Sequence, residues 1–244
     1  MSPRITLAIT LRVLIQLRRD RRTSVMLMVL PCVIMTLLWW MFQDKPSFGF
    51  EALAPALLAL IPFIIMFLVT SVTTLRERTS GTLERLLAMP MGKGDFLLGY
   101  AIAFGLVAAV QSGLAVGLSV WALGLDIAGP VWLLLVVAVL DAVLGSALGL
   151  FVSAFARTEF QAVQFMPALV IPQILLCGLF IERTDLPSVL HVISDVMPLS
   201  YAVDAMRKVS GNAHPALWGD LAVVVGFAAA GLVLGALTLR RRSE

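Results

Sequence analysis

The chain has 244 residues, of which 60% are hydrophobic and only 14% are charged, and its mean hydropathy is +0.97. Soluble domains are about 45 to 50% apolar, so this composition excludes a soluble globular protein and predicts an all-α membrane protein. The formal net charge of +3 is small, and the basic residues form no concentrated patch of the kind that a nucleic-acid partner requires.

The segment before the first long apolar run predicts an amphipathic helix. In PRITLAITLRVLIQLRRDRR, helical periodicity brings three leucines to one face and three polar side chains to the other. These are Leu7, Leu11 and Leu14 on the first face and Arg12, Gln16 and Arg19 on the second. We therefore expect residues 1–23 to form an interfacial helix whose arginines face anionic lipid. The alternative is a basic orientation signal that is helical by chance.

Six apolar stretches follow, and each is long enough to cross a hydrocarbon core of ~30 Å, which takes about 20 helical residues. They run from Ser24 to Phe42, Ala52 to Leu75, Phe96 to Leu123, Val131 to Phe155, Phe160 to Ile181 and Leu217 to Leu239. We expect residues 24–239 to form one six-span region and residues 240–244 a tail, so that 1–244 is a single transmembrane domain. Because six is even, both termini lie on the same side of the membrane.

The basic residues are distributed unequally between the two sides of this topology. One side holds Arg4, Arg12, Arg18, Arg19, Arg21, Arg22, Arg76, Arg78, Arg85, Lys93, Arg157, Arg240, Arg241 and Arg242. The other side holds only Lys45, Arg183, Arg207 and Lys208. By the positive-inside rule, the N-terminus, the C-terminus and the loop between the second and third spans are cytoplasmic.

That loop contains the densest group of polar side chains, RERTSGTLERLLAMP, from Arg76 to Pro90. Ser80 or Thr82 is suited to cap a short helix over TLERLLAM, and Pro90 ends it. An apolar stripe on this helix comprises Leu83, Leu86 and Leu87. Two helical turns are too few to be stable alone, so the helix needs a partner. The partner is either the protein's own helix ends and the lipid headgroups, or a groove on another cytoplasmic protein.

The fifth span and the segment after it are irregular. Pro167 and Pro172 each remove a backbone hydrogen bond inside the span, so we expect a kink or a re-entrant turn there. The only long external segment, at about 182–215, follows. Pro187 and Pro198 are suited to begin helices, which predicts two short external helices between the fifth and sixth spans.

Several kinds of catalytic site are absent from the sequence. The run GKGD at Gly92 lacks the leading glycine and the hydroxyl residue of a phosphate-binding loop. The two histidines, His191 and His214, do not have the H-E-x-x-H spacing of a zinc protease. We therefore expect no catalytic, cofactor-binding or metal site in this chain, and we expect that it is not an enzyme.

Asp141 lies in the middle of the fourth span, where a carboxylate costs about 2.5 to 3.5 kcal/mol on insertion scales. It has either a functional role or a structural one, as an acceptor of hydrogen bonds from a neighbouring helix or as a protonated acid. Gln111, Gln164 and Gln173 add neutral polar groups within the spans. These four residues are our candidates for a transport path between apolar walls.

The stretch RERTSGTLERLLAMPMGKGDFLLGY resembles the signature of the permease subunits of type-2 ABC exporters. That family includes daunorubicin-resistance-type drug exporters and exporters of polysaccharide or teichoic acid. The residues that carry the similarity are Glu77, Ser80, Gly81, Thr82, Leu83, Glu84, Arg85, Leu86 and Pro90. A second similarity lies in MPLSYAVDAMRKV, from Met197 to Val209, before the last span.

The resemblance implies that the short helix from Thr82 to Met89 is a coupling helix, seated in a cleft of a separate ABC ATPase subunit. The residues expected to dock that subunit are Glu77, Arg78, Ser80, Gly81, Thr82, Leu83, Glu84, Arg85, Leu86 and Leu87. It also implies two copies of the ATPase, which bind ATP and Mg, and a second permease chain that is identical or related. The location implied is the bacterial plasma membrane, where the chain contacts lipid and no nucleic acid.

From the residues and the resemblance together we expect the membrane-spanning subunit of an ATP-driven exporter. Its substrate would be a hydrophobic or amphipathic drug, antibiotic or lipid-like molecule, moved out of the cytoplasm or the inner leaflet. Two other hypotheses about the function stay open. One is a proton-coupled secondary carrier, or a lipid-handling membrane protein, that uses Asp141; the other is an assembly scaffold that transports nothing.

Overall fold

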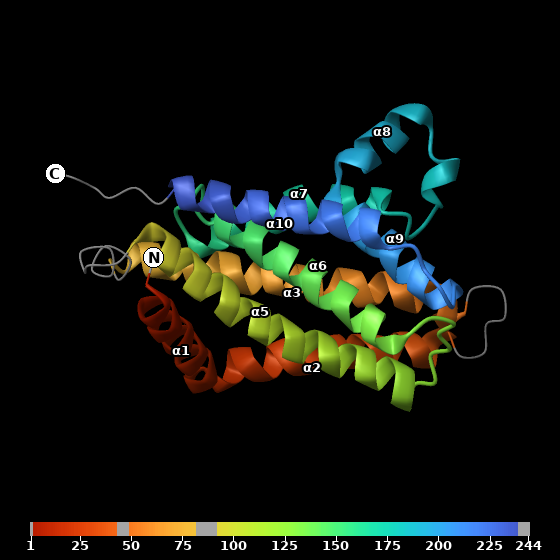
Figure 1. Cartoon of the computed structure of the whole chain (residues 1–244), viewed down its shortest axis with the longest axis horizontal. Coiled ribbons are helices and arrows are strands. Elements are labelled where there is room, and N and C mark those ends of the chain that lie inside the picture. The colour runs from red at the N-terminus through yellow and green to blue at the C-terminus, as the bar shows by residue number, and fades with distance from the viewer. Residues whose placement is uncertain (1, 43–48, 82–91, 239–244) are drawn as a thin grey trace.

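The computed structural model describes residues 2–42, 49–81 and 92–238, and in these ranges every regular element is a helix (Figure 1). The helices that meet the length and composition of a membrane span are α2 (Arg21–Phe42), α3 (Phe50–Thr79), α5 (Lys93–Gly117) with its π-helical end (Leu118–Ala122), α6 (Val131–Val152), α7 (Glu159–Leu176) and α10 (Trp218–Thr238). The others are α1 (Pro3–Arg19), a 3-10 turn (Arg183–Asp185), α8 (Ser188–Val196) and α9 (Pro198–Gly211). The predicted all-α fold with six candidate spans is confirmed.

Two of the spans end more than one helical turn from the residue that the hydropathy predicts. Helix α3 continues one turn past Leu75, to Thr79, because the charged residues of that turn have partners in the bundle. Helix α7 stops at Leu176 instead of reaching Ile181. The cause is Gly178, whose φ of 90° lies in the left-handed region that commonly terminates helices.

The predicted re-entrant turn at Pro167 and Pro172 is wrong, and a kink at these prolines stays a prediction. Helix α7 passes through both prolines without a break, and both residues lie on its exposed side. The sharp bend lies further along the chain, between α8 and α9, whose axes differ by 91°. These are the two predicted short helices between the fifth and sixth spans, and their existence is confirmed.

One guanidinium bridges α8 and α9. Arg183 donates to Ser194 at 2.8 Å and to Asp195 at 2.5 Å, and it also pairs with Asp204. Its guanidinium lies 5.1 Å from the ring centroid of Tyr201. Helix α9 is thereby fixed with one face buried against α3, α6 and α10, whereas α8 extends away from the bundle (Figure 1).

The centre of the bundle is the contact between α3 and α6, where two glycines allow the backbones to approach. A Cβ atom on Gly145 would lie 2.4 Å from the carbonyl oxygen of Phe63. One turn further on, a Cβ on Gly149 would lie 2.4 Å from the carbonyl oxygen of Phe67. The hydrophobic effect does not drive helices together within a membrane. Small residues at this spacing let two helices approach closely, so that van der Waals contacts stabilise the pair.

We predict that Gly145→Ala destabilises the protein by about 1 to 3 kcal/mol, because the added methyl group must push α3 and α6 apart. The matched control is Gly113→Ala, since the nearest neighbouring atom to a Cβ at that position is 3.9 Å away. The measurement is the denaturation midpoint of each purified variant in the same detergent. Equal midpoints for the two variants would contradict the close contact.

Candidate functional site

Three consecutive residues at the end of α3 bind three different parts of the bundle. Arg76 donates to both carboxylate oxygens of Glu159 on α7, at 2.7 and 2.9 Å. Arg78 donates to the hydroxyl of Thr238 on α10 at 3.2 Å. Glu77, between them, binds α1. Successive residues of a helix point about 100° apart, so one turn of α3 is tied to α7, α1 and α10.

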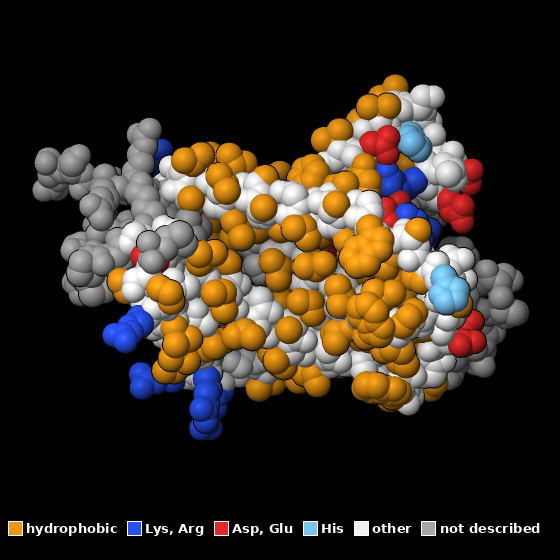
Figure 2. All heavy atoms as spheres, in the orientation of Figure 1, with side chains coloured by type: hydrophobic (Ala, Val, Ile, Leu, Met, Phe, Trp, Pro, Cys, Tyr) orange, Lys and Arg blue, Asp and Glu red, His pale blue; other side chains and the backbone are white. Residues whose placement is uncertain are grey.

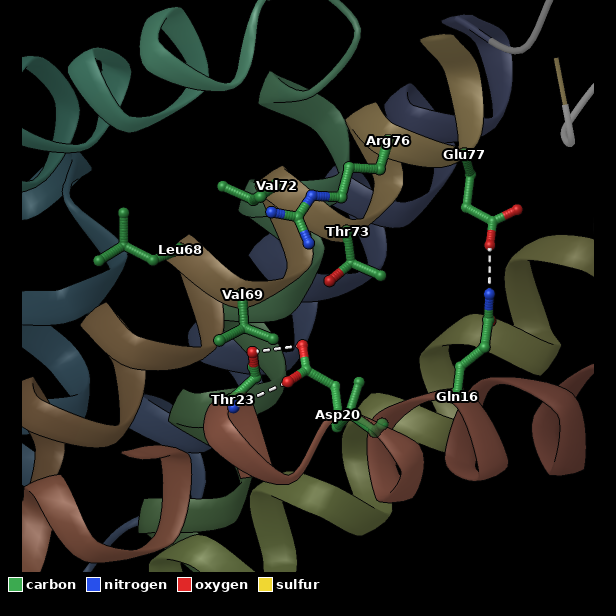
Figure 3. A pocket seen from close by; sticks show the side chains of 10 residues that line it. Gln16, Asp20, Thr23, Leu68, Val69, Val72, Thr73, Arg76 and Glu77 are labelled. Carbon is green, nitrogen blue, oxygen red and sulfur yellow. Dashed lines mark hydrogen bonds between the residues drawn. The ribbon is translucent and has the colours of Figure 1, made fainter. Parts of the chain in front are cut away.

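The Glu77 carboxylate is only 5% exposed and is neutralised by α1. Arg12 Nη2 lies 2.9 and 3.0 Å from its two oxygens, and Gln16 Nε2 donates to it at 3.1 Å. Figure 3 shows the Gln16 contact. A buried carboxylate without a cation is costly, so Arg12 and Gln16 turn inward. Our expectation that the arginines of this helix face lipid is therefore wrong for Arg12.

The face of α1 that packs on the bundle is not the leucine stripe. Leu7 and Leu11 are 59% and 50% exposed, whereas Ile9, Thr10 and Val13 are buried. The hydroxyl of Thr10 donates to the Gly99 carbonyl oxygen of α5 at 3.1 Å. Helix α1 therefore packs on α5 through Ile9, Thr10 and Val13 and leaves two of its leucines free to meet lipid.

A second contact joins α1 to the beginning of α5. The Asp95 carboxylate accepts hydrogen bonds from the backbone N–H of Ser2 at 2.9 Å, from the hydroxyl of Thr6 at 3.4 Å and from the backbone N–H of Gly92 at 3.1 Å. Asp95 is 3% exposed. Helix α1 is therefore bound both where α3 ends and where α5 begins, on either side of residues 82–91.

A pocket of about 410 Å³ lies beside this site, between α3 and the corner where α1 meets α2 (Figure 3). Its apolar lining is Leu17, Leu68, Val69 and Val72, and its polar lining is Gln16, Asp20, Thr23, Thr73, Arg76 and Glu77. Thr23 donates to Asp20 through its hydroxyl at 2.6 Å and its backbone N–H at 3.2 Å. These bonds, the hydroxyl first, hold the pKa of Asp20 below its usual range, so Asp20 stays ionised at the start of α2.

The predicted docking residues divide into two groups. Glu77 and Arg78 bind α1 and α10, Ser80 follows the last residue of α3, and Gly81 has a φ of 70°. The rest lie outside the described residues: Thr82, Leu83, Glu84, Arg85, Leu86 and Leu87. The coupling helix over them therefore stays a prediction. Glu77 and Arg78 have the contacts of residues that position the loop between α3 and α5.

Within the described part of the chain, no hydrogen bond links any two of the four transport-path candidates. Gln111 is fully buried and donates to the Leu27 carbonyl oxygen of α2 at 3.0 Å. Gln173 donates within α7, to the Leu169 carbonyl oxygen at 3.1 Å, and Gln164 is exposed on α7. Asp141 is 0% exposed, and neither of its oxygens has a hydrogen-bond partner among the described residues. A transport path that uses all four residues stays a prediction.

Sequence reasoning missed Arg12 and Asp95 as members of this site. Arg12 is one of several arginines near the N-terminus, and no local pattern distinguishes the one that pairs with Glu77. The position of Asp95 was a weak indication of its role, because a carboxylate at the very start of a span requires hydrogen-bond donors. The partners of Arg12 and Asp95 in this contact, Glu77 on one side and Ser2 and Thr6 on the other, lie more than sixty positions away, so only the fold reveals them.

Comparison with known proteins identifies the family. A family model described as ABC-2 type transporter matches residues 5–210, which run from the first turn of α1 to the end of α9. The chain belongs to the ABC-2 type transporter family. Permeases of this family are membrane subunits without an ATPase site of their own.

Curated relatives of this ABC-2 permease come from bacteria and from a eukaryote. Probable multidrug ABC transporter permease YbhR of Escherichia coli is 28% identical over 155 residues, covering 64% of this chain and 42% of the relative. Probable multidrug ABC transporter permease YbhS of the same organism is 25% identical over 193 residues, covering 78% and 51%. ABC transporter G family member 20 of Dictyostelium discoideum is 24% identical over 198 residues, covering 80% and 27%. The chain spans about a quarter to a half of the length of these relatives.

We predict that Arg12→Met destabilises this permease by about 3 kcal/mol, because it leaves Glu77 buried without a cation. The double variant Arg12→Met with Glu77→Met should recover most of that loss, since it removes the buried charge as well. The measurement is the denaturation midpoint of each variant in one detergent.

The control for this prediction is Arg76→Met, which breaks a pair whose side chains are 60% and 51% exposed. Exposed pairs contribute less than about 1 kcal/mol. If Arg12→Met and Arg76→Met have equal effects, or if the double variant is no more stable than Arg12→Met, the Arg12–Glu77 pair is not the stabilising contact.

Proposed function

We propose that this chain is the membrane-spanning subunit of an ATP-driven exporter, with residues 82–89 as the coupling helix that docks a separate ATPase. The observation that carries the proposal is the anchoring of both sides of that segment to α1, through Glu77 on one side and Asp95 on the other. A membrane subunit without a nucleotide site must receive mechanical work from its partner. A segment whose two flanks are fixed to the bundle is suited to receive it.

The contacts at the end of α3 offer a route for that work. Movement of the ATPase would displace the coupling segment, and Arg76, Glu77 and Arg78 would pass the displacement to α7, α1 and α10 together. Packed helices move as rigid elements with discrete arrangements, so a small shift at their ends is amplified into a larger rearrangement of the spans. As in the sequence-based topology, this end of the bundle is taken as cytoplasmic, in a bacterial plasma membrane.

A second permease chain, identical or related, is part of the proposal, together with two copies of the ATPase. Its support is the exposed side of α7, where Gln164, Pro167 and Pro172 lie among apolar residues. Polar side chains and prolines in a span usually face protein, because lipid offers them no hydrogen bonds. The exposed side of α2, in contrast, bears large apolar residues such as Val29, Val33 and Leu37, which lipid can cover.

The proposed substrate is a hydrophobic or amphipathic molecule that enters from the inner leaflet or the cytoplasm. Two observations support it. The pocket beside Glu77 has an apolar wall on α3 and a polar rim, as an amphipathic ligand requires. Two of the bacterial relatives also carry the name multidrug ABC transporter permease.

We predict that Leu83→Asp abolishes recovery of an ABC ATPase with the tagged chain, because it places a charge in the apolar stripe of the coupling helix. The experiment is purification from native membranes in mild detergent, with the recovered proteins identified by mass spectrometry. The matched control is Val192→Asp on α8, which makes the same change at a residue that is already 62% exposed. Equal ATPase recovery with both variants would refute the docking assignment.

Asp141 keeps the proton-coupled carrier as a second candidate function, because it is fully buried and lacks a hydrogen-bond partner among the described residues. The two functions differ in their energy source. We predict that transport in vesicles requires ATP, persists in the presence of a protonophore and retains at least about half its rate in Asp141→Asn. Transport that survives ATP depletion and is lost in Asp141→Asn would instead support the carrier.

A further inference from the structure

A second groove lies on the opposite side of the corner between α1 and α2, facing α5. It has a volume of about 360 Å³ and is open on one side. Its lining residues are Leu14, Leu17, Arg18, Arg21, Ser24, Val25, Met28 and Val107. It therefore combines two guanidinium groups and one hydroxyl with five apolar side chains contributed by three helices.

Among the described residues, the two guanidinium groups have no acidic partner. Neither Arg18 nor Arg21 takes part in an ion pair within residues 2–42, 49–81 and 92–238. The nearest acidic residue in the sequence, Asp20, lines the other pocket and is bound to Thr23. The corner thus separates its charges, with the carboxylate on the α3 side and the two arginines on the α5 side.

Apart from the two arginines and Ser24, the residues that line the groove are apolar. Met28 is partly buried, Val25 is 57% exposed, and Val107 of α5 forms the floor at 7% exposure. Leu14 and Leu17 of α1 form the opposite wall. Figure 2 shows basic side chains gathered near α1 and its corner with α2, next to the hydrophobic surface of the spans. A ligand here would meet positive charge at one end and hydrocarbon along the rest of its length.

We propose that this groove binds one anionic phospholipid of the inner leaflet, with the phosphate between Arg18 and Arg21 and an acyl chain along Val25, Met28 and Val107. Guanidinium groups match phosphate in charge and in hydrogen-bond geometry. Basic pockets between helices at the cytoplasmic surface are suited to phospholipid headgroups. The inner-leaflet location rests on the orientation in the proposed function, whereas the affinity for the lipid does not.

A bound lipid would also stabilise the helix that flanks the coupling segment. Ser24 donates to the Leu17 carbonyl oxygen at 2.6 Å, so α1 and α2 are already joined at the base of the groove. A phosphate held by one arginine from each helix would add a second bridge across the same corner. The lipid would thereby help to fix α1, which binds Glu77 and Asp95.

The experiment measures lipid binding to the full chain as purified, without nucleotide, so that failure of the exporter proposal does not affect the readout. After delipidation, native mass spectrometry follows the binding of dioleoyl phosphatidylglycerol, dioleoyl phosphatidylcholine and inorganic phosphate. We compare Arg18→Ala/Arg21→Ala with Arg19→Ala/Arg22→Ala. Both variants lose two positive charges from the same segment, but Arg19 and Arg22 do not line the groove.

We expect one tightly bound phosphatidylglycerol per chain, with an affinity at least ~10-fold lower in Arg18→Ala/Arg21→Ala. The affinity in Arg19→Ala/Arg22→Ala should change less than ~3-fold, and phosphatidylcholine should bind more weakly than phosphatidylglycerol. Val25→Trp, which narrows the groove without changing charge, should also weaken retention. Denaturation midpoints of all the variants identify any that have lost their fold.

Four results would overturn the proposal. Equal losses in the two double-arginine variants would mean that the basic segment attracts lipid without a defined site. Equal binding of the two lipids would remove the role of the arginines. Displacement of the lipid by millimolar inorganic phosphate, or no effect of Val25→Trp in a folded variant, would show that the apolar groove does not hold an acyl chain.

Discussion

The arrangement of this permease depends on one buried carboxylate. Glu77 lies in the last turn of the second span, inside the protein, and among the described residues Arg12 and Gln16 of α1 donate side-chain hydrogen bonds to it. This requirement draws the polar face of α1 inward, which leaves Leu7 and Leu11 exposed and presses Ile9 and Val13 onto α5. With α1 in that position, Ser2 and Thr6 reach Asp95, and both flanks of residues 82–91 become fixed to one helix.

Polar contacts between the helices decide how this bundle is arranged because lipid, and not water, surrounds the spans. Lipid tails are as apolar as leucine, so burying an apolar side chain between two membrane helices supplies little driving force and little rotational specificity. In this bundle the close packing of α3 on α6 at Gly145 and Gly149 brings the backbones together. The directional contacts lie at the end of α3, where three successive side chains bind three different elements. The same helix thus combines close packing in its middle with ion pairs and hydrogen bonds at its end.

The spans and the family signature were predictable because they are local properties of the sequence. Each apolar run long enough to cross the membrane became a helix, and Pro198 correctly marked the start of α9. The path of α7 through Pro167 and Pro172 was not predictable, since neighbouring groups decide whether a proline breaks a membrane helix. Nor was the partner of Glu77, because several arginines precede the first span and their order alone does not select Arg12.

The central claim is that the Arg12–Glu77 pair holds the coupling segment in the position from which ATP hydrolysis drives the spans. The most direct test is the number of substrate molecules transported per ATP hydrolysed, measured in vesicles that contain this permease and its ATPase. The claim predicts that Arg12→Glu and Glu77→Arg each lower this ratio at least ~10-fold, and that the double variant with exchanged charges restores most of it. An unchanged ratio in folded single variants, or no recovery in a folded double variant, would contradict the claim.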